Sequence, residues 1–85
     1  MSYTVYILTC KDNTLYTGIT TDLNKRIEEH NSSDKGAKYT RARRPVVLSY
    51  SERALNRSEA SKREYAIKKL SRTQKLALIY SSSSS

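Results

Sequence analysis

The stretch from Tyr16 to His30 constrains the fold more than any other part of the chain, because it combines a strand, a helix cap and an amphipathic helix. Apolar or β-branched side chains recur at every second position of residues 15–20, which is typical of a half-buried strand. Asp22 follows, and its side chain can accept hydrogen bonds from the first turn of a helix. That helix carries an apolar stripe that ends in a histidine: Leu23, Ile27 and His30. Arg26 borders the stripe, so we expect a cation and an imidazole to share the face that meets the sheet.

The length of 85 residues allows one small domain, which we assign to residues 1–80. The serine run at residues 81–85 has low complexity, and we expect it to be disordered. The single cysteine, Cys10, excludes an internal disulfide and a multi-cysteine zinc site. The sequence has neither a signal peptide nor an apolar run of membrane-spanning length. We therefore expect a cytoplasmic protein that does not associate with a membrane.

Two further strands are predicted from local composition. Residues 3–10 are rich in β-branched and aromatic side chains and predict a first strand. The turn-forming residues 11–14 should fold this strand back onto the second one as an antiparallel hairpin. Pro45, which suits an edge or a strand start, precedes a third strand at residues 46–51. Three strands are the minimum for a self-supporting sheet.

Two further helices are predicted in the C-terminal half. Asn56 and Glu59 form a capping pair for a helix over residues 57–70. Its inward face carries Ala60, Ile67 and Leu70. Glu64 lies between them, and a carboxylate on that face must meet a cation, a metal ion or water. The alternative is that Glu64 is one half of an ordinary salt bridge. A break at residues 71–73 separates this helix from a short one at 74–80, whose packing residues are Leu76, Ile79 and Tyr80.

Residues 31–45 show no apolar periodicity, and we expect them to form a loop. Within it, positive charge surrounds one aromatic ring, with no acid between, at Lys35, Lys38, Tyr39, Arg41, Arg43 and Arg44. Such a segment suits phosphate contacts, with a ring for stacking on a base or sugar. The net charge of +8 also attracts polyanions. The alternatives are a solvated charge run and a basic surface that serves solubility.

Few residues are candidates for chemistry. The sequence has no glycine-rich phosphate loop, no paired Cys/His set and no serine nucleophile elbow. It has one inward carboxylate, a histidine and an arginine on a shared helix face, two strand tyrosines and a basic loop. This set suits phosphodiester hydrolysis, in which a carboxylate holds a divalent cation, an arginine stabilises phosphate charge, and a tyrosine or histidine moves a proton.

Taken in order, these motifs resemble the GIY-YIG nuclease domain. Thr4-Val5-Tyr6 and Tyr16-Thr17-Gly18 stand where the family has its two name-giving motifs. Residues 22–31 match the helix that follows, and Glu64 stands where the family carries its metal-binding glutamate. Residues 35–41 and 68–72 further resemble the small stand-alone UPF0213 branch of the family. The resemblance extends from Tyr3 to Ile79.

The resemblance implies an α+β fold, with a three-stranded antiparallel sheet flanked by helices, and a metal-dependent nuclease. It implies that one cleft is lined by Tyr6, Tyr16, Arg26, His30 and Glu64. By analogy with the family, Glu64 would bind one Mg²⁺ or Mn²⁺, and Arg26 would contact the scissile phosphate. Tyr16 would help to deprotonate the attacking water, while Tyr6 and His30 would position it or share the proton.

The implied partner is a nucleic acid, DNA rather than RNA, and no protein partner is evident. Two other classes stay open. One is a nucleic-acid-binding module that keeps the pocket with weak or no cleavage. The other is an adaptor whose basic face binds an acidic protein.

The hairpin register decides whether the two tyrosines can act together. An odd-length loop places Tyr6 and Tyr16 on the same face of the sheet, and an even-length loop places them on opposite faces. Catalysis needs the first arrangement, so we predict a three-residue loop at residues 12–14 that pairs Tyr6 with Thr20. The Asp12-Asn13 pair suits a type I turn that is followed by a left-handed residue.

Overall fold

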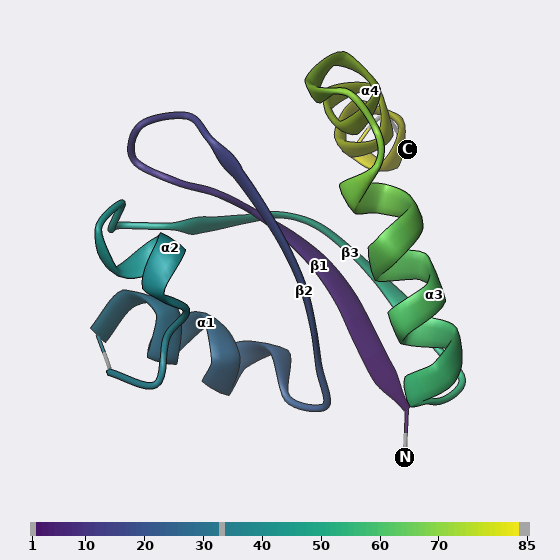
Figure 1. The fold of residues 1–85 in the computed structure, drawn as a ribbon, viewed down its shortest axis with the longest axis horizontal. Coiled ribbons are helices and arrows are strands. Elements are labelled where there is room, and N and C mark those ends of the chain that lie inside the picture. The colour runs from purple at the N-terminus through teal and green to yellow at the C-terminus, as the bar shows by residue number, and fades with distance from the viewer. Residues whose placement is uncertain (1, 33, 84–85) are drawn as a thin grey trace.

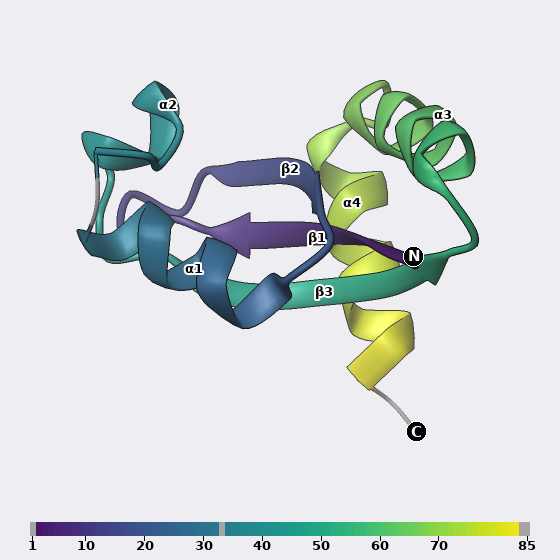
Figure 2. The same ribbon diagram turned by 90° about the horizontal axis from the view of Figure 1, so that it is seen from below.

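Three antiparallel strands form one sheet in the order β2-β1-β3, with helices on both of its faces (Figures 1 and 2). This computed structural model describes residues 2–32 and 34–83. In chain order its elements are β1 (Tyr3–Thr9), β2 (Leu15–Thr20), α1 (Leu23–Ser32), α2 (Lys38–Arg41), β3 (Val47–Ala54), α3 (Arg57–Lys68) and α4 (Arg72–Ser83). The predicted α+β architecture is confirmed. Among the described residues, no helix is long and apolar enough to cross a membrane.

The hairpin between β1 and β2 has the odd-length loop that the sequence predicts. The backbone N–H of Cys10 donates to the carbonyl of Thr14 (2.9 Å), so three residues, 11–13, make the loop. Asn13 adopts a φ of 67°, the left-handed region that asparagine tolerates and a β-branched threonine resists. The loop therefore ends at Asn13, one residue earlier than predicted.

The predicted register was wrong by two residues, although the predicted side-chain arrangement is confirmed. Tyr6 lies opposite Gly18 rather than Thr20, and Leu8 lies opposite Tyr16. Residues that face each other across an antiparallel pair project to the same side. Both tyrosine rings therefore occupy one face of the sheet, because a shift by two residues preserves the side.

The two faces of the sheet carry separate cores. On one face, α1 covers a cluster built from Tyr6, Leu8, Cys10, Val46, Tyr16, Leu23 and Ile27. On the other face, α3 and α4 cover a cluster that includes Val5, Ile7, Ala60, Ile67, Leu78 and Ile79. Figure 1 shows α1 and α2 at one side of the sheet and α3 and α4 at the other. The site residues are therefore divided between two layers.

The first helix begins where the sequence predicts. Asp22 accepts a hydrogen bond from the backbone N–H of Lys25 through Oδ1 (3.2 Å), which confirms the cap. The helix continues to Ser32, so the loop predicted from residue 31 begins later. The loop prediction was also wrong for Lys38–Arg41, which form α2. A four-residue helical turn is too short to show periodicity, and tertiary contacts of its buried Thr40 hold it in place.

The third strand ends later than predicted, and the helix after it begins at Arg57 as predicted but ends two residues earlier, at Lys68. β3 runs to Ala54, three residues beyond the predicted end, because its last residues pair with Tyr3, Thr4 and Val5 of β1. Asn56 caps α3 by accepting from the backbone N–H of Glu59 (2.9 Å), as predicted.

The last helix begins at Arg72 rather than at residue 74. Ser71 and Gln74 form a reciprocal capping box: the Ser71 hydroxyl accepts from the Gln74 N–H, and the Gln74 side chain accepts from the Ser71 N–H. The helix continues through Ser83, so the predicted disordered tail differs from the structure at residues 81–83; residues 84–85 lie outside the described residues. Ile79 packs on the core as predicted, whereas Tyr80 is 67% exposed.

Candidate active site

A buried polar pair lies at the centre of the candidate site. Tyr6 of β1 is 1% exposed and His30 of α1 is fully buried. The Tyr6 hydroxyl lies 2.9 Å from Nε2 of His30. Burial of two polar side chains is tolerated when they satisfy each other's hydrogen-bonding groups. The pair thus joins the sheet to α1 through their polar atoms.

Thr40 of α2 fixes the direction of this hydrogen bond. Its hydroxyl donates its only hydrogen to the carbonyl of Ala37 (2.9 Å). The same oxygen lies 2.7 Å from Nδ1 of His30, so it must accept a hydrogen from that nitrogen. A neutral imidazole carries one N–H, and Nε2 is therefore the acceptor for the Tyr6 hydroxyl. Tyr6 therefore donates to His30, His30 donates to Thr40, and Thr40 donates to the carbonyl of Ala37.

Both members of the pair are neutral at pH 7. Burial lowers the pKa of His30 to about 4, an effect that Arg26 and Arg44 reinforce and Glu29 opposes. Burial also raises the pKa of Tyr6 to about 12, although the adjacent Arg26 guanidinium favours the phenolate and limits the rise. These directions agree with the donor and acceptor roles above, because a neutral phenol donates to a neutral imidazole.

Gly18 provides the space that the Tyr6 ring occupies. A Cβ atom at residue 18 would lie 2.5 Å from the Tyr6 hydroxyl oxygen and 2.7 Å from Cζ. The φ of Gly18 is not positive, so its backbone conformation is open to other residues. The requirement for glycine therefore comes from the neighbouring ring.

Arg26 brings a partly exposed cation to this pair. Its side chain is 27% exposed, and its Nη1 contacts Oε1 of Glu29 (3.2 Å) and donates to the backbone carbonyl of Lys35 (2.7 Å). Partial burial lowers the pKa of Arg26, but hydrogen bonding and charge from Tyr6 and Glu29 together raise it above its usual value. The guanidinium is thus held in place while it still reaches solvent.

Tyr16 is the more accessible of the two strand tyrosines. Its ring meets the edge of His30, with centroids 5.3 Å apart, and stacks on Tyr39 at 6.0 Å. Arg43 lies 3.9 Å above the centre of the Tyr39 ring. Tyr16 is half-buried whereas Tyr6 is buried. Solvent therefore reaches part of the Tyr16 side chain, whereas the Tyr6 side chain is enclosed.

Glu64 lies on α3 and, in the part of the chain that the structure describes, makes no hydrogen bond or ring contact with the four preceding residues of the site. Its side chain is 25% exposed, and Oε2 pairs with Nζ of Lys68 at 3.5 Å. The structure thus contains the salt bridge that the plainer interpretation predicts. Glu64 also adds to the raised pKa of Tyr6, after larger causes, so its carboxylate lies within electrostatic reach of the phenol.

The protein groups near Glu64 suit only some metal ions. Within residues 2–32 and 34–83, no group of three or more His, Cys, Asp and Glu side chains could form a metal site. Mg²⁺ commonly takes one or two carboxylates and completes its coordination with water and substrate phosphates. A single half-buried carboxylate fits such an ion, and it does not fit a metal that needs a complete set of protein ligands.

The basic segment, residues 35–44, is only partly available to a ligand. Arg43 pairs with Asp12 at 3.1 Å, and Arg44 donates to the carbonyls of His30 and Glu29 at the end of α1. The exposed members are Lys35, Lys38, Tyr39 and Arg41. Phosphate contacts by these residues stay a prediction. Thr40, which the sequence analysis did not single out, lies within the segment that resembles the UPF0213 branch.

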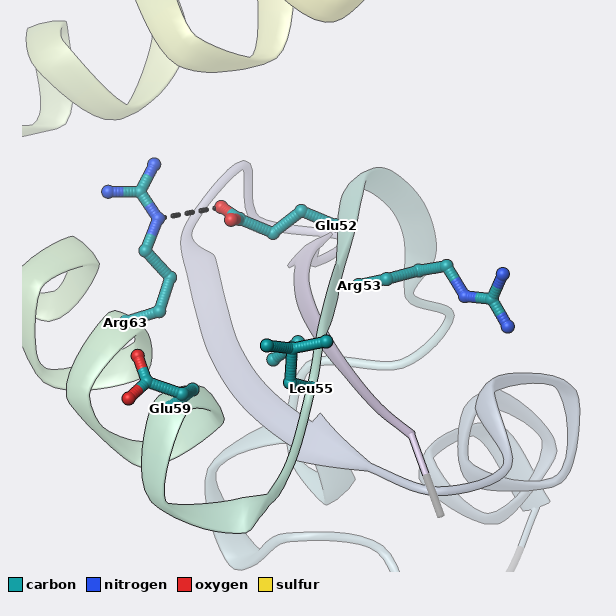
Figure 3. A pocket seen from close by; sticks show the side chains of 6 residues that line it. Glu52, Arg53, Leu55, Glu59 and Arg63 are labelled. Atoms are coloured by element: carbon teal, nitrogen blue, oxygen red, sulfur yellow. Dashed lines mark hydrogen bonds and ion pairs between the residues drawn. The ribbon is translucent and has the colours of Figure 1, made fainter.

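A separate pocket of about 270 Å³ lies where β3 meets α3 (Figure 3). None of the predicted site residues lines it. In it, Nε of Arg63 donates to Oε1 of Glu52 at 2.8 Å, while Arg53 points away from this pair. The pocket is thus distinct from the cluster around His30.

Comparisons with known proteins show which sequences and folds this chain is similar to. The sequence model of the GIY-YIG catalytic domain matches residues 2–77. A UPF0213 protein of Desulfotalea psychrophila is 65% identical over 78 residues, which cover 92% of this chain and 71% of that protein. A UPF0213 protein of Staphylococcus haemolyticus is 60% identical over 75 residues, 88% of this chain and 90% of the relative. The solution NMR structure of a UPF0213 protein from Bacillus halodurans is 48% identical in sequence and matches with a TM-score of 0.60. The match covers 94% of this chain and 84% of the Bacillus halodurans chain.

Proposed function

Because this chain belongs to the GIY-YIG family, and within it to the UPF0213 proteins, we propose that it is a metal-dependent nuclease that hydrolyses phosphodiester bonds in DNA. One observation carries the proposal. A buried, fully hydrogen-bonded pair, Tyr6 and His30, lies beside a partly exposed arginine and a partly exposed tyrosine. The arginine also holds Glu29 and the backbone of Lys35, and its remaining exposed surface is what a phosphate can reach.

The cation is the group that this site offers to a phosphate. A guanidinium at the edge of a buried cluster can contact the scissile phosphate and stabilise the charge that develops on it. In the structure the Arg26 side chain is fixed by Glu29 and by the carbonyl of Lys35. Arg26 therefore needs little reorganisation when a phosphate arrives.

The two tyrosines have different roles in this proposal. Moving the Tyr6 proton to His30, from a pKa of about 12 to one of about 4, costs on the order of 10 kcal/mol. Tyr6 and His30 are therefore positioning residues that hold the site. Tyr16, which a substrate can reach, is the residue that orients the attacking water and takes part in its deprotonation.

Glu64 is the residue that would hold one Mg²⁺ or Mn²⁺. Such an ion, when bound, supplies a Lewis acid for the phosphate and lowers the pKa of a coordinated water. The Lys68 ammonium must give way to it, because the ammonium now neutralises the carboxylate. A single-carboxylate site leaves the remaining coordination to water and phosphate.

A second function is favoured by the same salt bridge. If Glu64 keeps Lys68 as its partner, the protein binds nucleic acid through Arg26 and the basic segment without cleaving it. This binder and the nuclease differ in one measurable property, which is metal-dependent product formation.

The deciding experiment is a cleavage assay with the purified full chain. End-labelled single-stranded, duplex and branched DNA, with matched RNA, is incubated with Mg²⁺, Mn²⁺ or EDTA. Glu64→Ala is compared with Glu59→Ala, a matched control on the same helix whose carboxylate also pairs with a lysine, Lys62, at 3.6 Å. The nuclease predicts metal-dependent cleavage by the wild type and by Glu59→Ala, and none by Glu64→Ala. Binding of DNA without cleavage in either metal identifies the binder instead.

A further inference from the structure

The corner between α3 and α4 concentrates positive charge with little opposing charge. After Glu64 the sequence contains no acid, and its basic residues there are Lys68, Lys69, Arg72 and Lys75. They occupy the end of α3, the connection and the first turns of α4. All are exposed except Lys75, which is half-buried. We call these four residues together with Tyr65 the basic corner.

An exposed aromatic ring accompanies these cations. Tyr65 on α3 is 64% exposed and belongs to neither core cluster. The ammonium group of Lys69 lies 4.7 Å from the centre of its ring. A ring that faces solvent beside a cation offers a stacking surface next to a phosphate contact, the combination that single-stranded nucleic acid uses. Packing gives no reason for this ring to be aromatic.

The basic corner adjoins the candidate site. Lys68, its first cation, pairs with the Glu64 carboxylate at 3.5 Å. The basic segment and α2 lie at the other end of the molecule, beyond the sheet, as both ribbon views show (Figures 1 and 2). In the proposed function a nucleic-acid strand passes Arg26 and Glu64, and from there it can continue toward the basic segment or toward the basic corner.

The basic segment provides fewer phosphate contacts than its charge suggests. Arg43 pairs with Asp12, and Arg44 donates to two carbonyls at the end of α1. A second basic surface would therefore add phosphate contacts for a longer strand. Among the described residues, Lys69 and Arg72 have no acidic partner in an ion pair, so both can contact phosphates.

We propose that the basic corner is a second nucleic-acid contact surface, which binds a single DNA strand on the Glu64 side of the site. Lys69, Arg72 and Lys75 contact phosphates, and a base stacks on Tyr65. This inference rests on the proposed function for the path of the strand, but its test measures binding and needs no cleavage. An acidic protein would also be attracted by the charge, although it would not need the ring.

The test compares two double charge reversals. Lys69→Glu with Arg72→Glu alters the basic corner. Arg53→Glu with Arg57→Glu is the control, because both residues are exposed and the net charge changes by the same amount. Arg57 begins α3 and lies about 18 Å along the helix axis from Lys69. Affinity for a fluorescent single-stranded DNA is measured by anisotropy in EDTA over a series of salt concentrations, and the thermal midpoint is measured to verify folding.

We expect the corner variant to bind more weakly than the control, with a slope of log affinity against log salt shallower by about 1.4, the value for two lost single-strand contacts. Tyr65→Ala should lower affinity about fivefold or more, while Tyr65→Phe retains it. Equal losses in both double reversals, or no loss in either, would overturn the proposal. Binding of polyglutamate that competes equally with DNA would also overturn it, because the site would then bind any polyanion.

The cleavage assay separates this inference from the proposed function. If the wild type binds DNA through the basic corner but never cleaves it, the nuclease proposal is wrong and the proposed contact surface is confirmed. If the wild type cleaves DNA and the corner variant binds like the control, the proposed contact surface is wrong and the nuclease proposal is confirmed.

Discussion

The hydroxyl group of Tyr6 donates its hydrogen to Nε2 of His30 across 2.9 Å, and both residues are closed to solvent. This direction depends on a third residue, because Thr40 accepts the hydrogen on Nδ1 and so determines which nitrogen of the imidazole stays unprotonated. The arrangement of the phenol beside Arg26 is therefore linked to α2, a four-residue turn in the basic segment.

Replacing Thr40 by valine should allow the hydrogen of the His30 imidazole to occupy either ring nitrogen. Valine keeps the shape of threonine but cannot accept the Nδ1 hydrogen, so a buried N–H loses its partner at a cost of about 1–3 kcal/mol. We expect the ¹⁵N shifts of the single histidine to move toward a mixture of tautomers. Thr40→Ser keeps the acceptor and should keep the wild-type shifts. Unchanged shifts in the valine variant would show that Thr40 does not set the tautomer.

The protonation of His30 should make the protein less stable in mild acid. Its pKa is about 4 in the folded protein and near 6.5 when unfolded, so the unfolded chain binds more protons between these values. Stability should therefore fall as the pH falls from about 6.5 to 4, by on the order of 3 kcal/mol in total. Urea midpoints across this range measure the slope, which should be shallower in His30→Gln. An NMR titration that places the single histidine near 6.5 would contradict the expectation.

Gly18→Ala should cost stability only while the Tyr6 ring is present. The new methyl group overlaps the phenol, and overpacking of this kind costs about 1–3 kcal/mol. In a Tyr6→Ala background the same substitution should cost almost nothing, because the backbone of residue 18 accepts alanine. A double-mutant cycle by urea denaturation measures the coupling. If Gly18→Ala lowers the free energy of unfolding equally in both backgrounds, the new methyl group does not clash with the Tyr6 ring.

Glu64→Gln should separate cleavage from binding. The substitution removes the charge that attracts a divalent cation and repels phosphate, so metal-dependent cleavage should vanish while DNA affinity stays equal or rises slightly. Glu59→Gln, which removes a comparable ion pair with Lys62, should leave both properties unchanged. If Glu64 is only a salt-bridge partner, its variant keeps any activity and loses at most about 1 kcal/mol of stability.

Within the basic segment, two kinds of residue should respond differently to substitution. Arg44→Ala removes donors from the end of α1 and should lower the free energy of unfolding by about 1–2 kcal/mol. Lys38→Ala and Arg41→Ala alter exposed side chains and should change stability by less than about 0.5 kcal/mol. Each should instead make the salt slope of duplex DNA binding shallower by about 0.9. The same thermal and anisotropy measurements on all three variants check this division, and a stable Arg44→Ala protein would refute it.

Much of the fold could be predicted because its signals are local. The alternation in β2, the Asp22 cap and the Asn56 cap each depend on a few neighbouring residues, and all three appear in the structure. The length of β3 could not be predicted in this way. Its last three residues are polar or small, and they are in a strand because β1 pairs with them.

The site was predictable in its residue types and less so in its geometry. Spacing placed Arg26 and His30 on one helix face, and the parity of the hairpin loop placed both tyrosines on one side of the sheet. Nothing in the local sequence indicates that the hydroxyl of Thr40 reaches His30, because the contact joins residues ten positions apart through a loop and a short turn. The position of Glu64 in a different layer likewise depends on how α3 packs.

The clash between a side chain at position 18 and the ring at position 6 has a consequence for the evolution of these proteins. Gly18 is required by its neighbour across the sheet and not by its own backbone, so the residue tolerated at position 18 depends on the residue at position 6. A lineage that replaced the phenol with a small residue would be released from the glycine, and its descendants would accumulate larger residues there. Substitutions at the two positions should thus appear together among homologous sequences, and the glycine should persist wherever the tyrosine does.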